Sequence, residues 1–322
     1  MNSVPRISYI SQFVIFWGLL AAAFLFSSSL GVILWVAMTG GDLDSIKNGT
    51  MTAENADAVK IVQLVASTAM FLIPALVFAR IVNNRPLRHL GLRTGFSWIQ
   101  LGLGAIIIFI AFYLSGSLAE LTNQIPIPEK WEKLFTKLEK QYMDQVMVMA
   151  NMESFGDYLF TMLVIAIAPA IFEELLFRGA FQQLLSKWTR LPWLAITITS
   201  ILFSAVHFSY YGFLSRVALG LILGLLFHYS KSLWLPIIAH FINNGVAVTM
   251  MYIMKMQGKL TPEVLDEKFP IWWGVIAAAI IGCLFILLRN ESKKNGSYYI
   301  DNTEVKSNNP FLPTAVNDPG HP

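Results

Sequence analysis

The sequence is poor in charge and has almost no cysteine. Only 13% of its 322 residues are charged, 55% are hydrophobic, and Cys283 is the single cysteine. One cysteine excludes an intrachain disulfide and argues against a cysteine-based metal site. The net charge of +3 comes without a basic stripe interleaved with aromatic residues, so nucleic acid is not expected as a partner. A chain this apolar is not an ordinary soluble domain.

Long apolar runs take the place of the missing charge. A helix that spans a bilayer needs about 20 mostly apolar residues, and the sequence offers eight such runs. They are residues 13–38, 60–82, 98–119, 157–182, 192–209, 213–229, 232–254 and 271–289. The first run is longer than a signal-peptide core, so we expect a retained helix rather than a cleaved signal. The predicted fold is an all-α, polytopic transmembrane helix bundle of about eight spans.

Basic residues gather in alternate loops, as the positive-inside rule expects of a multi-pass protein. Four arginines follow the second run, and further lysines and arginines follow the fourth, sixth and eighth runs, whereas the first loop is mainly acidic. This pattern predicts a protein of the cell membrane, embedded in the lipid bilayer, with both termini in the cytoplasm. We expect one transmembrane domain over residues 1–289 and a disordered polar cytoplasmic tail over residues 290–322.

The loop after the third run is long and has its own pattern. Apolar residues recur in it at helical spacing, namely Trp131, Leu134, Phe135, Leu138 and Tyr142. The segment 130–152 is therefore predicted to be an amphipathic helix lying in the membrane interface. Several methionines follow, and a methionine-rich face can adapt to varied apolar peptides. We favour the simpler role for them, which is packing against a neighbouring helix.

Three charged residues stand inside the fourth apolar run: Glu173, Glu174 and Arg178. A charge at the centre of a spanning helix costs about 2.5–3.5 kcal/mol on insertion scales, and such residues usually serve a function. Glu174 and Arg178 are four residues apart, so they share a helix face and can form an ion pair. Glu173 points about 100° away from that face. We therefore expect Glu174 and Arg178 to give structural support and Glu173 to be the free carboxylate.

Two histidines lie in later apolar runs. His207 is in the fifth run, and His240 is in the seventh, four residues before Asn244 and on the same helix face. A histidine and an amide that point into a bundle can bind a metal or donate to an oxyanion. The His-Glu-x-x-His zinc pattern is absent. With these boundaries, Glu173 lies near the cytoplasmic end of its helix while His207 lies about 22 Å deep at 1.5 Å per residue, so the two depths disagree.

The order and spacing of these residues resemble a known signature. Glu173-Glu174-x-x-x-Arg178, Phe203-x-x-x-His207 and His240-x-x-x-Asn244 are similar to the three-part motif of the CAAX protease and bacteriocin-processing family. The resemblance covers roughly residues 157–250 and includes similarity to the type II CAAX prenyl endopeptidases.

The resemblance implies an intramembrane endopeptidase acting on a membrane-associated protein or peptide. It implies that Glu173 and His207 activate a water while His240 and Asn244 stabilise the oxyanion. Alternatively, it implies that Glu173, His207 and His240 hold a divalent metal such as zinc. We favour water activation without a required metal.

Two other functions remain open from the residues alone. A proton-coupled membrane transporter would use the buried carboxylates as a relay, but it predicts acidic sites in both halves of the chain, and the second and third runs lack them. A non-catalytic scaffold would have little physical reason to bury these polar groups. Arg216, early in the sixth run, either extends to the surface or contacts substrate. Pro169 and Pro236 each free a backbone carbonyl near the site.

Overall fold

The computed structural model describes residues 7–48, 51–265 and 269–296, and within these ranges the chain forms helices and no strands. Five single helices cross the bundle: α1 (Tyr9–Thr39), α6 (Trp98–Asn123), α12 (Phe213–Ser230), α13 (Trp234–Met256) and α15 (Ile271–Lys294). One longer helical run consists of α3 (Ala56–Ser67), η2 (Thr68–Leu72) and α4 (Ile73–Val82). A second consists of α8 (Phe155–Thr161), η3 (Met162–Ile167), α9 (Ala168–Glu174), η4 (Leu175–Gln182) and α10 (Gln183–Thr189). The remaining helices are α2 (Leu43–Asn48), η1 (Ala53–Asn55), α5 (Pro86–His89), α7 (Glu129–Met149), α11 (Pro192–Ala205) and α14 (Pro262–Leu265).

The predicted all-α, multi-pass membrane fold is confirmed. Among the described residues, 7 helices are long and apolar enough to cross a membrane. The fifth predicted run, 192–209, corresponds to α11, which has 14 residues and ends at Ala205. A helix of that length rises roughly 21 Å, which is less than the roughly 30 Å thickness of the hydrocarbon core. This element therefore crosses only part of the bundle, and His207 lies in the loop after it.

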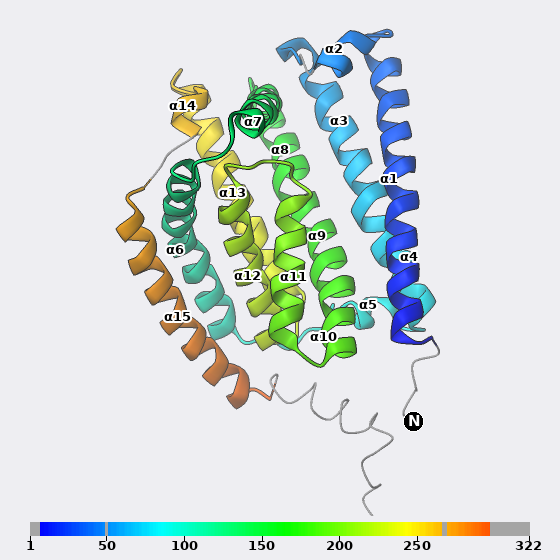
Figure 1. The fold of residues 1–322 in the computed structure, drawn as a ribbon, viewed down its shortest axis with the longest axis vertical. Coiled ribbons are helices and arrows are strands. Elements are labelled where there is room, and N and C mark those ends of the chain that lie inside the picture. Colours follow the sequence, from blue (N-terminus) through cyan, green and yellow to red (C-terminus); the bar gives the residue numbers. More distant parts are fainter. Residues whose placement is uncertain (1–6, 49–50, 266–268, 297–322) are drawn as a thin grey trace, which may run out of the picture.

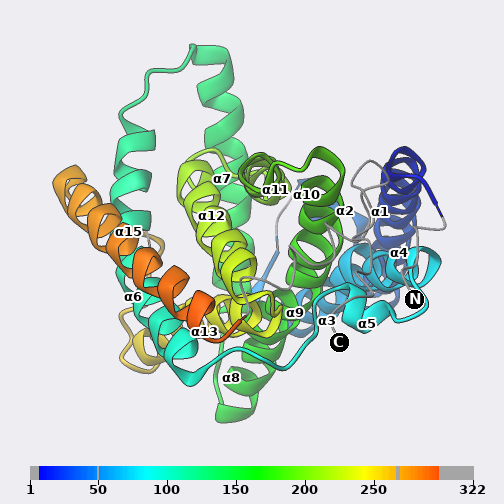
Figure 2. The same ribbon diagram turned by 90° about the horizontal axis from the view of Figure 1, so that it is seen from below.

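The helices form three groups (Figures 1 and 2). Helices α1, α3 and α4 lie on one side, α6 and α15 lie on the other, and α8 to α13 lie between them. Helix α1 begins and helix α15 ends at the lower end of the bundle in Figure 1, where α4 and α10 also end. The basic residues that follow alternate runs therefore gather at this one end. Helix α15 extends to Lys294, beyond the expected start of the tail at residue 290, and residues 297–322 of that tail lie outside the described residues.

Two apolar clusters hold the three groups together. In the first, Phe16 of α1 stacks on Phe181 of η4 with 5.0 Å between ring centroids and meets Phe78 of α4 edge-on. The second joins α6, α12, α13 and α15 through buried residues such as Leu223 and Phe285. Helix–helix association in lipid rests on close packing rather than on the removal of apolar surface from water. The central helices thus pack against neighbouring helices on both sides, and this packing fixes the positions of the polar residues between them.

The fourth span is longer than predicted. We placed its end at residue 182, but the helical run continues from Phe155 to Thr189, a length of 35 residues. The last turns contain polar side chains that find partners inside the protein. Gln182 donates to the carbonyl of Gly224 at 3.1 Å, and Gln183 donates to the carbonyl of His89 at 2.9 Å. Because the N–H groups of both amides find acceptors within the bundle, their polarity does not end the helix.

The predicted amphipathic segment forms helix α7 of 21 residues. It crosses the upper end of the bundle in Figure 1, above the central helices. Trp131 and Leu134 on this helix are exposed, while Met149 and the following Met152 are buried in separate apolar clusters. The methionines at its end therefore pack against neighbouring helices.

Candidate active site

A fully buried ion pair lies near the middle of the long helical run 155–189. Arg178 Nη1 donates to Glu174 Oε1 at 2.6 Å, and both side chains are 0% exposed. Arg178 Nη2 also donates to the carbonyl of Gly220 on α12 at 3.2 Å, and its guanidinium lies 4.5 Å from the centre of the Phe203 ring. Glu174 Oε2 and Arg178 Nε have no hydrogen-bond partner among the described residues. Removing either charge would leave the other one buried and unpaired, which is costly.

His240 on α13 contacts both glutamates. Its Nδ1 donates to Glu174 Oε1 at 3.0 Å, and its Nε2 lies 4.0 Å from Glu173 Oε2. Because a carboxylate can only accept, the bond to Glu174 places the ring proton on Nδ1 and turns Nε2 toward Glu173. Glu173, Glu174, Arg178 and His240 are hereafter called the glutamate cluster. Sequence spacing indicated the Glu174–Arg178 pair but not the bond between Glu174 and His240.

His207 is held at the edge of this cluster by its own backbone. Its Nδ1 lies 2.8 Å from the carbonyl oxygen of Phe203, and since a carbonyl only accepts, Nδ1 carries the proton. The unprotonated Nε2 is left as an acceptor. The helix stops before His207, because Phe208 adopts the left-handed conformation with φ of 51°. The residue therefore lies in a loop, residues 206–212, hereafter called the His207 loop, and not in the helical span that we predicted for it.

Phe203 connects the two histidines. Its ring centroid is 5.2 Å from that of His207 and 5.9 Å from that of His240, and it also meets Phe177 edge-on. Through this ring, His207 lies beside the glutamate cluster. The depth mismatch expected from the sequence disappears, because the longer fourth span places Glu173 near its middle and the short α11 brings His207 to a similar level. No hydrogen bond or ion pair joins His207 directly to Glu173 in the described part of the chain.

Asn244 hydrogen bonds to two other residues of the protein. Its Nδ2 donates to the carbonyl of Ile165 in η3 at 3.2 Å, and its Oδ1 accepts from Asn243. Ile165 is the residue four positions before Pro169, and proline lacks the N–H that would bond to this carbonyl in an α-helix. Asn244 therefore satisfies a carbonyl that Pro169 cannot. One further N–H of its amide is left for another acceptor.

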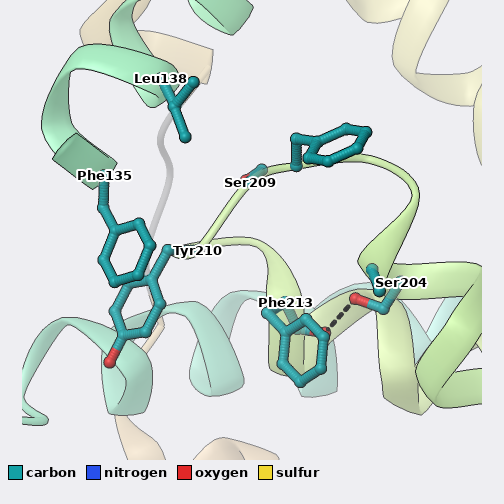
Figure 3. Close-up of a pocket in the computed structure, with 8 residues that line it drawn as sticks. Phe135, Leu138, Ser204, Ser209, Tyr210 and Phe213 are labelled. Atoms are coloured by element: carbon teal, nitrogen blue, oxygen red, sulfur yellow. Dashed lines mark hydrogen bonds between the residues drawn. The ribbon is translucent and has the colours of Figure 1, made fainter. Parts of the chain in front are cut away.

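A small pocket opens beside the His207 loop (Figure 3). It has a volume of about 200 Å³, and α7, α11, the His207 loop and α12 form its walls. Phe135 of α7 stacks on Tyr210 with 4.5 Å between centroids, and Ser204 Oγ donates to the carbonyl of Phe213, as drawn in Figure 3. Helix α7 is also tied to the loop where Ser209 Oγ donates to Glu139 at 2.8 Å. The loop that carries His207 is thus one wall of a mainly apolar pocket.

The residues proposed as metal ligands do not form a metal site in this arrangement. Among residues 7–48, 51–265 and 269–296, no group of three or more histidine, cysteine, aspartate or glutamate side chains is placed so that it could hold a metal ion. His240 Nε2 approaches Glu173, but His207 does not join them as a third ligand. A structural or catalytic zinc needs three or four converging ligands. We therefore derive no step that involves a metal.

Two glycines on α12 position the cluster, and we did not use them in reading the sequence. Gly220 and Gly224 are four residues apart, and a Cβ on either would come within 2.9 Å of α11 side chains, those of Ser200 and Ile196. Their carbonyls accept the bonds from Arg178 and Gln182, which are also four residues apart. The spacing of two small residues separated by three others is a known sign of close helix packing in membranes. It was visible in the sequence as Gly220-x-x-x-Gly224.

Comparison with known proteins agrees with this geometry. Residues 155–246 match the family model described as type II CAAX prenyl endopeptidase Rce1-like. The match confirms the resemblance drawn from the signature, and it covers the two helices and the loop that carry Glu173, His240 and His207. The segment 155–246 therefore resembles a CAAX-type protease within a multi-pass membrane protein.

One curated relative is similar to part of the chain. The uncharacterized protein YpbD of Bacillus subtilis (strain 168) is 35% identical over 92 residues, which are 27% of this chain and 42% of that protein. The similarity thus spans less than half the length of the curated relative. No solved structure matches the chain.

Proposed function

We propose that the protein is an intramembrane endopeptidase that hydrolyses a peptide bond in a membrane-associated protein or peptide. One observation carries this proposal. The segment that matches the protease family brings a carboxylate, Glu173, and two histidines, His207 and His240, from three separate elements to one buried place around Phe203. Convergent titratable groups in an apolar bundle are a common sign of an active site.

The orientation of the histidine rings suits them for handling a water. His240 Nε2 and Glu173 Oε2 are 4.0 Å apart, too far for a hydrogen bond but close enough for one water oxygen to contact both. The Nδ1 of each histidine is occupied by Glu174 or by the carbonyl of Phe203, so each Nε2 is the atom left for chemistry.

The reaction then follows the general acid–base pattern. Glu173 accepts a proton from the water as the water oxygen attacks the peptide carbonyl carbon, with His207 as a second acceptor. The resulting oxyanion is stabilised by N–H donors, for which the candidates are the remaining N–H of Asn244 and, once the ring carries a second proton, the Nε2–H of His240. Collapse of the intermediate breaks the C–N bond, and the proton held by Glu173 passes to the leaving amine. Glu174 and Arg178 act as positioning residues, because they hold the ring of His240 and the helix of Glu173.

The proposed location follows from charge. We infer that the end of the bundle that carries the basic loops faces the cytoplasm of the cell, which places both termini there. The domain proposal is likewise retained: a membrane domain to about residue 289 and a separate polar tail. Fusing a reporter enzyme to either terminus and measuring its protection from external protease tests this orientation.

The test of function uses the full-length protein in liposomes with a library of lipid-anchored peptides. Mass spectrometry detects new peptide termini, and heavy-oxygen water marks the new carboxyl group if the bond is hydrolysed. Glu173→Gln and His207→Gln are each expected to lower kcat/KM by about 10²-fold or more, because removal of a general base typically costs 10²–10⁴-fold.

Glu120→Gln is the matched control, because it makes the same isosteric change at a carboxylate that only accepts a bond from Gln124 on its own helix end. It is expected to retain full activity. Unchanged cleavage by both Glu173→Gln and His207→Gln would overturn the proposal.

A further inference from the structure

Arg216, in the first turns of α12, is a cation without an anionic partner. None of its side-chain nitrogens hydrogen bonds to another residue in the described part of the chain, and its Nη1 is fully buried. A guanidinium has five N–H donors and remains charged at every physiological pH. Buried charges are normally paired, because taking an unpaired charge out of water is expensive. The residue is therefore short of an acceptor.

The surroundings of Arg216 hold the guanidinium in place without neutralising it. Its centre lies 5.2 Å from the ring of Tyr142 on α7, a cation–π contact. The nearby acid on α7, Glu139, accepts a bond from Ser209 instead. On the other side the guanidinium lies directly against Gly212, where any side chain would overlap Nη1. The glycine thus leaves the space that the cation occupies.

The position of Arg216 relates it to the proposed active site. Its charge acts on both Glu173 and His207, so it is electrically part of the same region. It follows the His207 loop directly, and Phe213, three residues before it, is part of the wall of the apolar pocket in Figure 3. Phe213 and Arg216 are three residues apart on α12 and so lie on the same helix face. A ligand that extends from the pocket along this face therefore reaches the guanidinium of Arg216. Such a ligand would combine an apolar group with a negative charge.

We propose that Arg216 binds a carboxylate of the peptide substrate and so determines the specificity of the enzyme, with an apolar side chain of the substrate in the neighbouring pocket. This inference rests on the proposed peptidase function. Arg–carboxylate pairs are planar and frequently bidentate, which gives them both strength and orientation. The carboxylate has two sources in a peptide: an acidic side chain and the free C-terminus. A carboxylate held here fixes how far along the substrate the scissile bond lies from that group.

The experiment measures binding and cleavage separately. The probes are N-palmitoylated hexapeptides of leucine and alanine with one glutamate, made in four versions: the free acid, the C-terminal amide, the version with glutamine for glutamate, and the version with both changes. Binding is measured in liposomes in the Glu173→Gln background, which does not depend on catalysis. The protein with Arg216 is expected to bind the carboxylate peptides about tenfold to a hundredfold more tightly than the peptide with both changes.

Substitution of Arg216 distinguishes a loss of carboxylate recognition from a general loss of peptide binding. Arg216→Gln should remove this preference while leaving affinity for the uncharged peptide unchanged, and Arg216→Lys should restore part of it. Arg289→Gln, at an exposed arginine of α15, removes the same charge far from the pocket and should change nothing. The single-change peptides identify the source of the carboxylate. If the C-terminal amide loses the tighter binding, the source is the C-terminus, and if the glutamine version loses it, the source is the glutamate side chain.

Two results would overturn the inference. One is equal binding of all four peptides, and the other is an equal loss of affinity for all four in Arg216→Gln, which would mean a purely structural role. Failure of the proposed function looks different. In that case peptides are not cleaved, or Glu173→Gln cleaves them as well as the unmodified protein does, whereas the binding preference for carboxylates can still be read.

Discussion

The glutamate cluster and the His207 loop meet at Phe203 but differ in charge balance. In the cluster, Glu174 and Arg178 are both completely buried and neutralise one another at 2.6 Å. Beside the loop, the buried Nη1 of Arg216 has no hydrogen-bond partner, and no ion pair of Arg216 is found among the described residues. Folding thus neutralises the charge of Arg178, whereas the charge of Arg216 is left for a ligand to neutralise. The comparison teaches that one arginine serves the fold and the other is available for recognition.

The largest expected effect contrasts the two arginines directly. Arg178→Gln leaves Glu174 as an unpaired buried charge and should lower the free energy of unfolding by about 3–5 kcal/mol. Arg216→Gln removes an unpaired charge and should change it by less than about 1 kcal/mol. Thermal and denaturant unfolding in detergent, followed by circular dichroism, measures both. Similar losses in the two variants would refute the division of roles, and partial recovery in Glu174→Gln/Arg178→Gln would support it.

A middle-sized effect is expected where α13 meets the long helix. Asn244→Ala leaves the carbonyl of Ile165 without its donor and should destabilise the protein by about 1–3 kcal/mol. Pro169→Ala supplies the missing backbone N–H, so the double variant should be less destabilised than the sum of the two single variants predicts. Unfolding of all four proteins gives the coupling free energy. Strict additivity would show that the bond between Asn244 and Ile165 does not compensate for the proline.

The smallest expected effect concerns the loop. The stack of Phe135 on Tyr210 links α7 to the His207 loop, and aromatic pairs contribute about 0.5–1.5 kcal/mol beyond their burial. Phe135→Leu should therefore speed hydrogen exchange of the backbone amides of residues 206–212 and leave the amides of α9 unchanged. Phe109→Leu, at an exposed phenylalanine of α6, serves as the control. Equal protection of the loop in both variants would show that α7 does not order it.

The elements that apolar length alone determines were predictable from sequence. The third apolar run, predicted over 98–119, corresponds to Trp98–Asn123, and the spacing of Glu174 and Arg178 indicated their ion pair. The end of the fourth span was not predictable, because Gln182 and Gln183 read as a helix end but bond to carbonyls of neighbouring segments. Hydrophobic periodicity indicates which residues share a helix face. It does not indicate which backbone carbonyl of another segment will accept a hydrogen bond from a side-chain amide.

Within the candidate site, the same limit applied to the polar partners. Four-residue spacing placed His240 and Asn244 on one face, yet Asn244 bonds to the carbonyl of Ile165, which lies on a different span. His207 was assigned to a helix because the apolar run continues past it, whereas the left-handed Phe208 ends that helix. Phe203 was visible only as part of a motif, and its role as the ring between two histidines depends on how three helices pack.

The π-helical stretches η2, η3 and η4 have a consequence for how this protein can change over time. In a π-helix each hydrogen bond reaches one residue further along the chain than in an α-helix, so each stretch behaves as an extra residue accommodated without breaking the helix. Deleting one residue from η3 would let this stretch become α-helix and would change the direction of Glu173 relative to α8 only slightly. The same deletion within regular α-helix, such as α9, would rotate the residues on its two sides by about 100° relative to each other. The π-helical stretches are thus the places where the chain can lose a residue while the direction in which the glutamates face is kept.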